Sequence, residues 1–150
     1  MALRLHYREP NDLDECVYDT VAAAGALGGQ GVERVVLVGW SFGGAVVITA
    51  GAASGAVVGV ATIASQTYGA GAVGELAPKS LLLIHGTADS VLPYHLSRHL
   101  YDRAGEPKEL VIYPDDDHGI NRHRSEMLEK LYIWAQVLLL DGSEHERDAV

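Results

Sequence analysis

The sequence predicts a single α/β domain, in which a mostly parallel sheet of about five strands carries helices on both faces. Short apolar runs rich in Val, Ile and Leu alternate along the chain with longer segments of helical periodicity. Continuous apolar runs are typical of strands buried on both faces, and parallel neighbours need a crossover connection such as a helix. A chain of 150 residues is the size of one domain with one hydrophobic core.

The first part of the chain supplies two helices and up to two strands. Residues 3–7 are compatible with a short strand, and Asn11 is suited to cap the helix that follows, because its side-chain oxygen can accept from free amides of the first turn. In residues 13–27, apolar residues recur at spacings of three and four, which predicts a helix. Residues 34–39 form a β-branched apolar run, and residues 43–53 are small and apolar, as expected for a helix packed closely on the sheet.

The second part continues the alternation. Residues 57–63, 80–85 and 108–113 predict three further strands. Residues 93–103 and 122–140 predict helices, each with an apolar face at helical spacing. In such sheets the reactive side chains gather at the carboxyl ends of the strands, so the segments that follow these strands are the place to search for a site.

The last predicted helix is amphipathic and is followed by a polar tail. The residues expected on its buried face are Met127, Leu128, Leu131, Trp134, Ala135 and Leu138. The domain is therefore expected to span residues 1–140, with residues 141–150 outside it. The connection over residues 65–79 is short and rich in Gly and Ala, which leaves no room for a lid domain.

Composition and charge exclude several classes of function. The chain has 20 acidic and 11 basic residues and a formal charge of −9, whereas nucleic-acid binding requires clustered Lys and Arg. Its single cysteine, Cys16, cannot form an internal disulfide. No apolar segment has the length of a membrane span, and the N-terminus does not resemble a secretory signal. We therefore expect a cytoplasmic protein that binds neither nucleic acid nor membrane.

No cofactor or metal site is predicted. His95 and His99 are four residues apart on a predicted helix, a spacing that permits metal binding, but no third ligand is evident nearby. A solvated helix face is the preferred interpretation of this pair. The glycines between Gly25 and Gly31 end a helix and follow no strand, so they do not form a dinucleotide-binding motif.

One turn has the sequence of a nucleophile elbow. The pattern G-x-S-x-G runs from Gly39 to Gly43, after a predicted strand and before a predicted helix, which is the setting that this motif requires. Ser41 would be the nucleophile. The turn is so tight that side chains at either glycine position are expected to collide with neighbouring elements. The amide of Phe42 lies at the helix N-terminus, where it can donate to a developing oxyanion.

Two later strand ends supply an acid and a base. Asp89 follows the strand at residues 80–85, and His118 follows the last strand, in the order nucleophile, acid, histidine. The imidazole would take the proton of Ser41, and Asp89 would orient the imidazole and stabilise its charged form. Asp117 is a reserve partner for the histidine. His85, which opens the acid loop, is expected to be a buried hydrogen-bonding residue.

The three segments together resemble α/β-hydrolases. Gly-Trp-Ser-Phe-Gly-Gly, His-Gly-Thr-Ala-Asp-Ser-Val-Leu-Pro and Asp-Asp-Asp-His-Gly are similar to blocks of the dienelactone-hydrolase and prolyl-oligopeptidase-like esterase branches, and the resemblance runs from Leu3 to Leu140. It implies a catalytic triad of Ser41, Asp89 and His118 and a carboxylesterase activity without cofactor. The missing lid favours small or short-chain esters as substrates.

The chain departs from this family at its start. The strands that precede the Leu3 segment in the family, and the loop that donates the second oxyanion amide, are expected to be missing. Phe42 is then the one assured donor, and an open sheet edge would favour a homodimer. A catalytically impaired binding or structural protein, or a fragment that a partner completes, is the alternative interpretation.

Two neighbouring features keep open interpretations. Trp40 could line an acyl pocket, although packing in the core is an equal alternative. The run Asp115 to Asp117 is expected to form a solvated turn.

Overall fold

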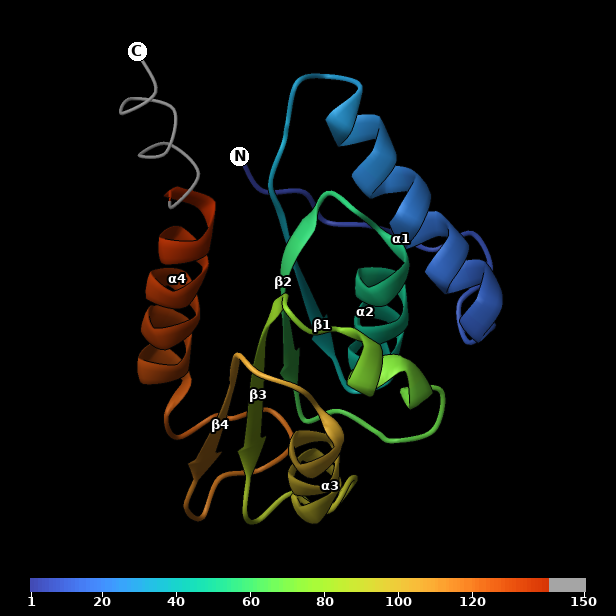
Figure 1. Ribbon diagram of the computed structural model, residues 1–150. Coiled ribbons are helices and arrows are strands. Elements are labelled where there is room, and N and C mark those ends of the chain that lie inside the picture. The colour runs from blue at the N-terminus through green and yellow to red at the C-terminus, as the bar shows by residue number, and fades with distance from the viewer. Residues whose placement is uncertain (141–150) are drawn as a thin grey trace.

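The computed structural model describes residues 1–140, which form a four-stranded, fully parallel sheet with helices on both faces (Figure 1). The sheet order β1-β2-β3-β4 follows the chain order. The elements are α1 (Leu13–Gly28), β1 (Val35–Trp40), α2 (Phe42–Ala53), β2 (Val57–Ile63), the 3₁₀ helix η1 (Gly71–Glu75), β3 (Ser80–Gly86), α3 (His95–Arg103), β4 (Lys108–Tyr113) and α4 (Arg124–Leu140). The α/β class and the parallel sheet are confirmed. The expected tail at residues 141–150 lies outside the described residues.

The expected count of about five strands is wrong, because residues 3–7 form no strand. Among the described residues this segment has no strand partner, and Leu3 and Leu5 are exposed. It leads instead to Arg8, whose side chain binds the acidic face of α1 through Glu15 and Asp19. β1 therefore pairs with β2 alone within the described residues.

The start of α1 also differs from the expectation. Asp12 caps the helix, with a carboxylate oxygen that accepts from the amide of Glu15 at 3.1 Å. Asn11, the expected cap, has a φ of 77°. Asn tolerates this left-handed region better than most residues, so Asn11 turns the chain and the next residue caps it. The other helices and strands lie within two residues of their expected bounds.

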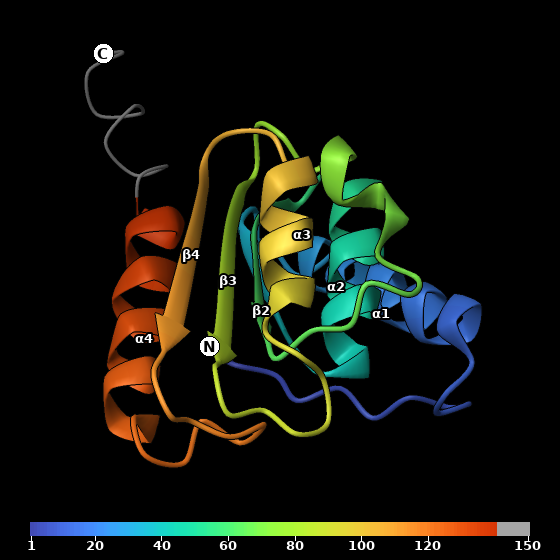
Figure 2. The same ribbon diagram turned by 90° about the horizontal axis from the view of Figure 1, so that it is seen from below.

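The two faces of the sheet carry separate apolar clusters. On one face, α1, α2, η1 and α3 lie together, whereas α4 covers the other face (Figure 2). Helix α2 packs closely on the sheet, and a Cβ at Gly51 would collide with Val60 of β2. This close approach explains why the residues of α2 after Phe42 are all small or β-branched.

Helix α4 contacts the sheet through a narrow stripe. Met127 is fully buried, and Leu131 and Trp134 pack against the same cluster. The expectation that Leu128 belongs to this face is wrong, because Leu128 is 50% exposed. Its position on the helix is rotated about 100° from that of Met127, which turns it away from the sheet.

Strand β1 forms one edge of the described sheet, and it is not fully covered. Val38, in the middle of this strand, is 48% exposed. Edges of this kind can pair with another chain, and the homodimer expected on that ground stays a prediction. Within residues 1–140, no helix combines the length and the apolar character needed to cross a bilayer.

Two lysines connect the starts of the strands to the ends of the helices. Lys79, directly before β3, donates to the carbonyl of Ser54 at 2.8 Å and to that of Gly51, at the end of α2. Lys108, the first residue of β4, donates to the carbonyls of Tyr101 and Ala104 at the end of α3, at 2.8 and 2.9 Å. An ammonium group is stabilised at a helix C-terminus by the partial negative charge there.

The carboxyl ends of the four strands lie level with one another. Ile63 of β2 pairs with Trp40 of β1 and with Ile84 of β3, and Gly86 of β3 pairs with Tyr113 of β4. The loops after β1, β3 and β4, which contain the three predicted catalytic residues, therefore begin at one edge of the sheet.

Candidate active site

Ser41 is the single residue between β1 and α2, and its backbone has a conformation that residues other than glycine rarely adopt. Its φ is 54° and its ψ is −117°. The conformation is held by a hydrogen bond of 2.8 Å from the amide of Ser41 to the carbonyl of Ile63 on β2. A non-glycine residue in this region is strained by about 1–3 kcal/mol. Strain of this kind is typical of the serine in a nucleophile elbow.

Two glycines make the turn possible, and they are not the pair expected from the motif. A Cβ at Gly39 would collide with the backbone of Gly43, and a Cβ at Gly44 would collide with the side chain of Ser65. A Cβ at Gly43 would meet nothing within 4 Å outside its own helix. The expected collision at Gly43 is therefore wrong, because its missing side chain would point into open space.

The amide of Phe42 is available for a ligand. Phe42 is the first residue of α2, and its N–H forms no hydrogen bond within residues 1–140. Amides at a helix N-terminus point out along the axis and carry partial positive charge. This is the geometry expected of an oxyanion donor, although the role of Phe42 stays a prediction.

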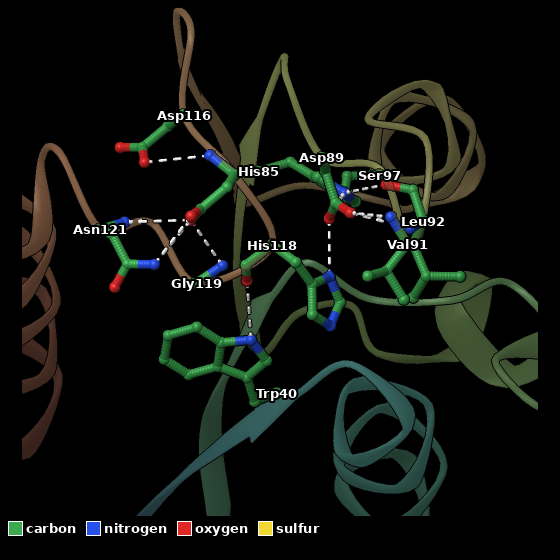
Figure 3. Close-up of polar contacts among 11 residues, drawn as sticks. Trp40, His85, Asp89, Val91, Leu92, Ser97, Asp116, His118, Gly119 and Asn121 are labelled. Carbon is green, nitrogen blue, oxygen red and sulfur yellow. Dashed lines mark hydrogen bonds and ion pairs between the residues drawn. The ribbon is translucent and has the colours of Figure 1, made fainter.

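The side chain of Asp89, in the loop after β3, is buried, and both of its carboxylate oxygens accept hydrogen bonds. Its Oδ1 accepts from the amides of Val91 and Leu92, each at 2.8 Å, and its Oδ2 accepts from ring nitrogens of His118 and His85 (Figure 3). Burial alone would raise the pKa of this carboxyl group. The hydrogen bonds that the amide of Leu92, the ring of His118 and the amide of Val91 donate to this carboxylate outweigh that effect. They hold the pKa of Asp89 below its ordinary value.

His118 binds Asp89 through one ring nitrogen and, within residues 1–140, makes no hydrogen bond through the other. The distance from its Nδ1 to Oδ2 of Asp89 is 2.7 Å, with the carboxylate buried and the imidazole 25% exposed. A carboxylate only accepts, so Nδ1 carries the proton and a neutral ring has an acceptor at Nε2. Since the ring is partly exposed, Nε2 is the nitrogen that a substrate or a serine hydroxyl can use.

The loop of His118 is tied to the strand that carries the serine. The indole N–H of Trp40 donates to the carbonyl oxygen of His118 at 3.1 Å (Figure 3), and Trp40 directly precedes Ser41. The Trp40 ring also packs against the apolar cluster beneath α4. Trp40 thus has a positioning contact that the sequence did not indicate, and its part in an acyl pocket stays a prediction.

The structure brings two of the three predicted catalytic side chains into a hydrogen bond. Asp89 and His118 are bonded to each other, whereas the hydroxyl of Ser41 forms no hydrogen bond within residues 1–140. In structures without a substrate, catalytic hydrogen bonds are often long and tighten only when the substrate binds. The assignment of Ser41 as nucleophile is therefore a prediction that rests on its motif and its backbone.

The run of three aspartates before His118 is only in part the solvated turn that the sequence suggests, because Asp115 and Asp117 are exposed but Asp116 is not. Asp116 is fully buried and accepts from the amides of Asp117, Arg122 and His123 and from Nδ1 of His123 at 2.9 Å. Burial raises the pKa of Asp116, but these donors together hold it below its ordinary value. The backbone turn at Asp115, whose φ is 55°, separates an exposed carboxylate from a buried one.

Asp117, the reserve partner of the histidine, binds elsewhere. Its carboxylate accepts from the amide of Gly119 at 2.9 Å and from the side-chain amide of Asn121. It makes no hydrogen bond to the His118 ring within the described residues, so Asp89 is the partner that the geometry favours. Within that same part of the chain, no group of three or more His, Cys, Asp or Glu is placed to hold a metal ion.

Known proteins support the hydrolase interpretation. Residues 62–141 match the prolyl oligopeptidase family, Peptidase_S9. The chain is 38% identical over 109 residues to the uncharacterized protein YfhR of Escherichia coli O157:H7, an alignment that covers 57% of this chain and 38% of that protein. The chain thus spans less than half the length of this relative.

Solved structures share the fold. An esterase domain from Rhodothermus marinus superposes with a TM-score of 0.71 at 22% identity, over 82% of this chain and 69% of that one. An α/β serine hydrolase homologue from Coxiella burnetii gives 0.70 at 19% identity, over 87% and 62% of the two chains. At these identities the likeness shows that the fold is that of α/β-hydrolases.

The two elbow glycines allow a matched test of the turn. Gly39→Ala is expected to lower the free energy of unfolding by more than about 2 kcal/mol, because the new Cβ would collide with backbone that cannot move away. Gly43→Ala is expected to change it by less than about 1 kcal/mol, because the position is open and Ala favours a helix. Urea denaturation of both variants measures the difference, and equal losses would contradict the account of the turn.

Asp116 gives the fold a pH dependence whose sign follows from its lowered pKa. The stabilisation is fully present above the ordinary carboxyl value of 3.8 and is lost as the pH falls below it. Asp116→Asn is expected to lower the free energy of unfolding by about 1.5–3 kcal/mol at pH 7. The difference from the unsubstituted chain should shrink as the pH falls toward 3.

The control for this prediction is Asp115→Asn, because Asp115 is exposed and its positive φ suits Asn. Denaturation curves recorded at several pH values between 3 and 7 make the comparison. An Asp116→Asn variant that unfolds like the Asp115→Asn variant at pH 7 would contradict the role assigned to the buried carboxylate.

Proposed function

Because this chain belongs to the prolyl oligopeptidase family of α/β-hydrolases, we propose that it is a serine hydrolase that cleaves small carboxylic esters through an acyl-enzyme on Ser41. The observation that supports this most strongly is the bond of 2.7 Å between His118 Nδ1 and the buried carboxylate of Asp89. This bond leaves Nε2 of the partly exposed His118 ring without a hydrogen bond in the described chain. The ring lies at the carboxyl ends of the strands, where Ser41 occupies a strained turn.

In the proposed reaction, the hydroxyl oxygen of Ser41 attacks the ester carbonyl carbon while Nε2 of His118 takes the hydroxyl proton. The imidazolium is stabilised by Asp89, and the oxyanion of the tetrahedral intermediate accepts from the amide of Phe42. Collapse of the intermediate expels the alcohol, which receives the proton from His118. Water then attacks the acyl group on Ser41 with the same histidine as general base, and the carboxylic acid leaves.

The preference for small esters follows from the connection between β2 and β3. Over residues 64–79 the described chain contains the short helix η1 and no further helix or strand, so no lid is built there. A long acyl chain gains affinity only where apolar walls bury it. Without such walls, a longer acyl chain is not expected to raise the rate.

A second candidate is a catalytically impaired binding protein, or a fragment whose sheet and oxyanion hole a partner chain completes. The observation that favours it is that β1 pairs with β2 alone within residues 1–140, and the side chain of Val38 on this strand is 48% exposed. The described residues also offer Phe42 as oxyanion donor without a clear second amide. Removing one donor in such a site reduces the rate by roughly 10²–10³, so low but measurable turnover is the expectation for the chain alone.

Labelling with a fluorophosphonate tests the proposal directly. The probe is expected to attach to Ser41, as identified by mass spectrometry of peptides, and p-nitrophenyl acetate should be hydrolysed. Ser41→Ala is expected to lose the label and to reduce turnover at least about a thousandfold, because the nucleophile is removed. Turnover should also fall at low pH, where a protonated His118 cannot act as base.

The control is Ser54→Ala, since Ser54 lies at the far end of α2 and contacts none of the predicted catalytic residues. An unlabelled Ser41, together with turnover equal to that of Ser41→Ala, would reject the enzyme and leave the second candidate.

A series of p-nitrophenyl esters tests the substrate class. Acetate and butyrate esters are expected to give the highest kcat/KM, and longer acyl chains should give no gain, because the described site has no lid. A kcat/KM that rises about tenfold or more from butyrate to octanoate would contradict the open site.

A further inference from the structure

His85 is a buried histidine that the proposed reaction does not use. It lies in β3, four residues before Asp89, and its side chain is fully buried. Its Nε2 is 3.0 Å from Oδ2 of Asp89 and 2.9 Å from the carbonyl oxygen of Leu92, and its Nδ1 is 2.7 Å from the hydroxyl of Ser97 on α3. Every ring nitrogen of this side chain therefore has a partner.

These partners determine the tautomer of His85. The carboxylate of Asp89 and the carbonyl of Leu92 can only accept, so Nε2 carries a proton and donates to both. A neutral ring then accepts at Nδ1, and the hydroxyl of Ser97 is the donor. A hydroxyl that donates to Nδ1 makes the Nε2 proton more acidic, so it strengthens the bond to Asp89.

The oxygen that His85 contacts is the one that serves His118. Oδ2 of Asp89 accepts from both imidazoles, at 2.7 Å from His118 and at 3.0 Å from His85, whereas Oδ1 is occupied by two backbone amides. Within the described residues, His85 and His118 are the titratable side chains that bind Asp89. A second donor on the same oxygen withdraws charge from it and so weakens the stabilisation that Asp89 gives to a charged His118.

We propose that His85, oriented by Ser97, is a positioning residue that fixes Oδ2 of Asp89 against His118 and competes with His118 for the negative charge on that oxygen. The inference rests on the proposed function, because it assigns His118 as the general base. The chain of donors runs from Ser97 through His85 to Asp89, and it connects helix α3 to the site. The effect of this chain of donors is expected to appear in the pH dependence of Ser41 labelling.

Three variants test the inference. His85→Leu removes the donor to Asp89, His85→Gln keeps an N–H donor at a similar distance along the side chain, and Ser97→Ala removes the donor to Nδ1. In His85→Leu the acidic limb of the pH dependence of Ser41 labelling should move to higher pH, and the labelling rate at its optimum should fall about tenfold, as expected for the loss of one hydrogen bond. Ser97→Ala should move the limb in the same direction by less, and His85→Gln should restore it.

The titration of the His118 ring, followed by long-range ¹H–¹⁵N NMR, gives a second measurement that needs no turnover. Its midpoint is expected to move to higher pH in His85→Leu, and the spectrum of the unsubstituted chain should show His85 protonated at Nε2. The matched control is His123→Leu, which removes a similar bond, of 2.9 Å, between an imidazole and the buried Asp116. That variant should lose stability without moving the His118 midpoint.

An acidic limb and a ring titration that stay in place in His85→Leu, with only a lower melting temperature, would overturn the inference. If His85→Leu does not fold, Ser97→Ala is compared with the unsubstituted chain, and an acidic limb that stays in place in Ser97→Ala would then overturn the inference. Failure of the proposed function is distinguishable, because an unlabelled Ser41 in the unsubstituted chain leaves the titration of His118 measurable.

Discussion

The alignment of the carboxyl ends of the four parallel strands is the constraint on which the rest of the molecule depends. Strand β3 pairs on both sides, and its residues Leu82 to Ile84 are fully buried, so its register cannot shift without exposing the core. The hydrogen bonds that continue past the strand ends, such as Thr87 to Tyr113 at 2.9 Å, carry this register into the loops. Side chains separated by dozens of residues therefore meet at one edge.

Beyond that edge, the loop that contains His118 is held by two buried carboxylates. Asp89 binds the His118 ring, and Asp116 binds His123, whose ring stacks on Tyr113 with centroids 5.0 Å apart. Trp40 adds a third attachment, because its indole N–H donates to the carbonyl oxygen of His118. Trp40 lies on β1 and Asp89 in the loop after β3, so the imidazole is oriented by contacts from outside its own loop. The pair of Asp116 and His123 fixes another part of that loop next to Tyr113 of β4.

The sequence predicted the parts of this structure that depend on local pattern. The apolar runs of β2 and β4 and the helical spacing of α3 and α4 are properties of short segments, and their bounds agree within two residues. Residues 3–7 have the composition of a strand, but within residues 1–140 they pair with no other strand. Pairing depends on a neighbour that is not visible in a single segment. The placement of this segment therefore could not be predicted.

The candidate site was likewise predictable only in part from the sequence. The motif around Ser41 and the order of Asp89 and His118 were visible in the sequence, whereas the buried role of Asp116 was not. Three consecutive aspartates look equivalent in a sequence, and only the turn at Asp115 decides which of them faces inward. Ser97 had no signal at all, because a serine within a polar helix is typical of a solvated surface.

The conformation of Ser41 bears on why a serine, and not a glycine, occupies position 41. With φ at 54° and ψ at −117°, glycine would hold the same turn at a lower free energy. The turn alone therefore does not account for the serine. What glycine lacks is the hydroxyl, which the turn holds at the edge of the sheet without a hydrogen-bond partner in the described chain. Under the proposed function, the strain at position 41 makes folding less favourable but keeps one oxygen atom available for the reaction.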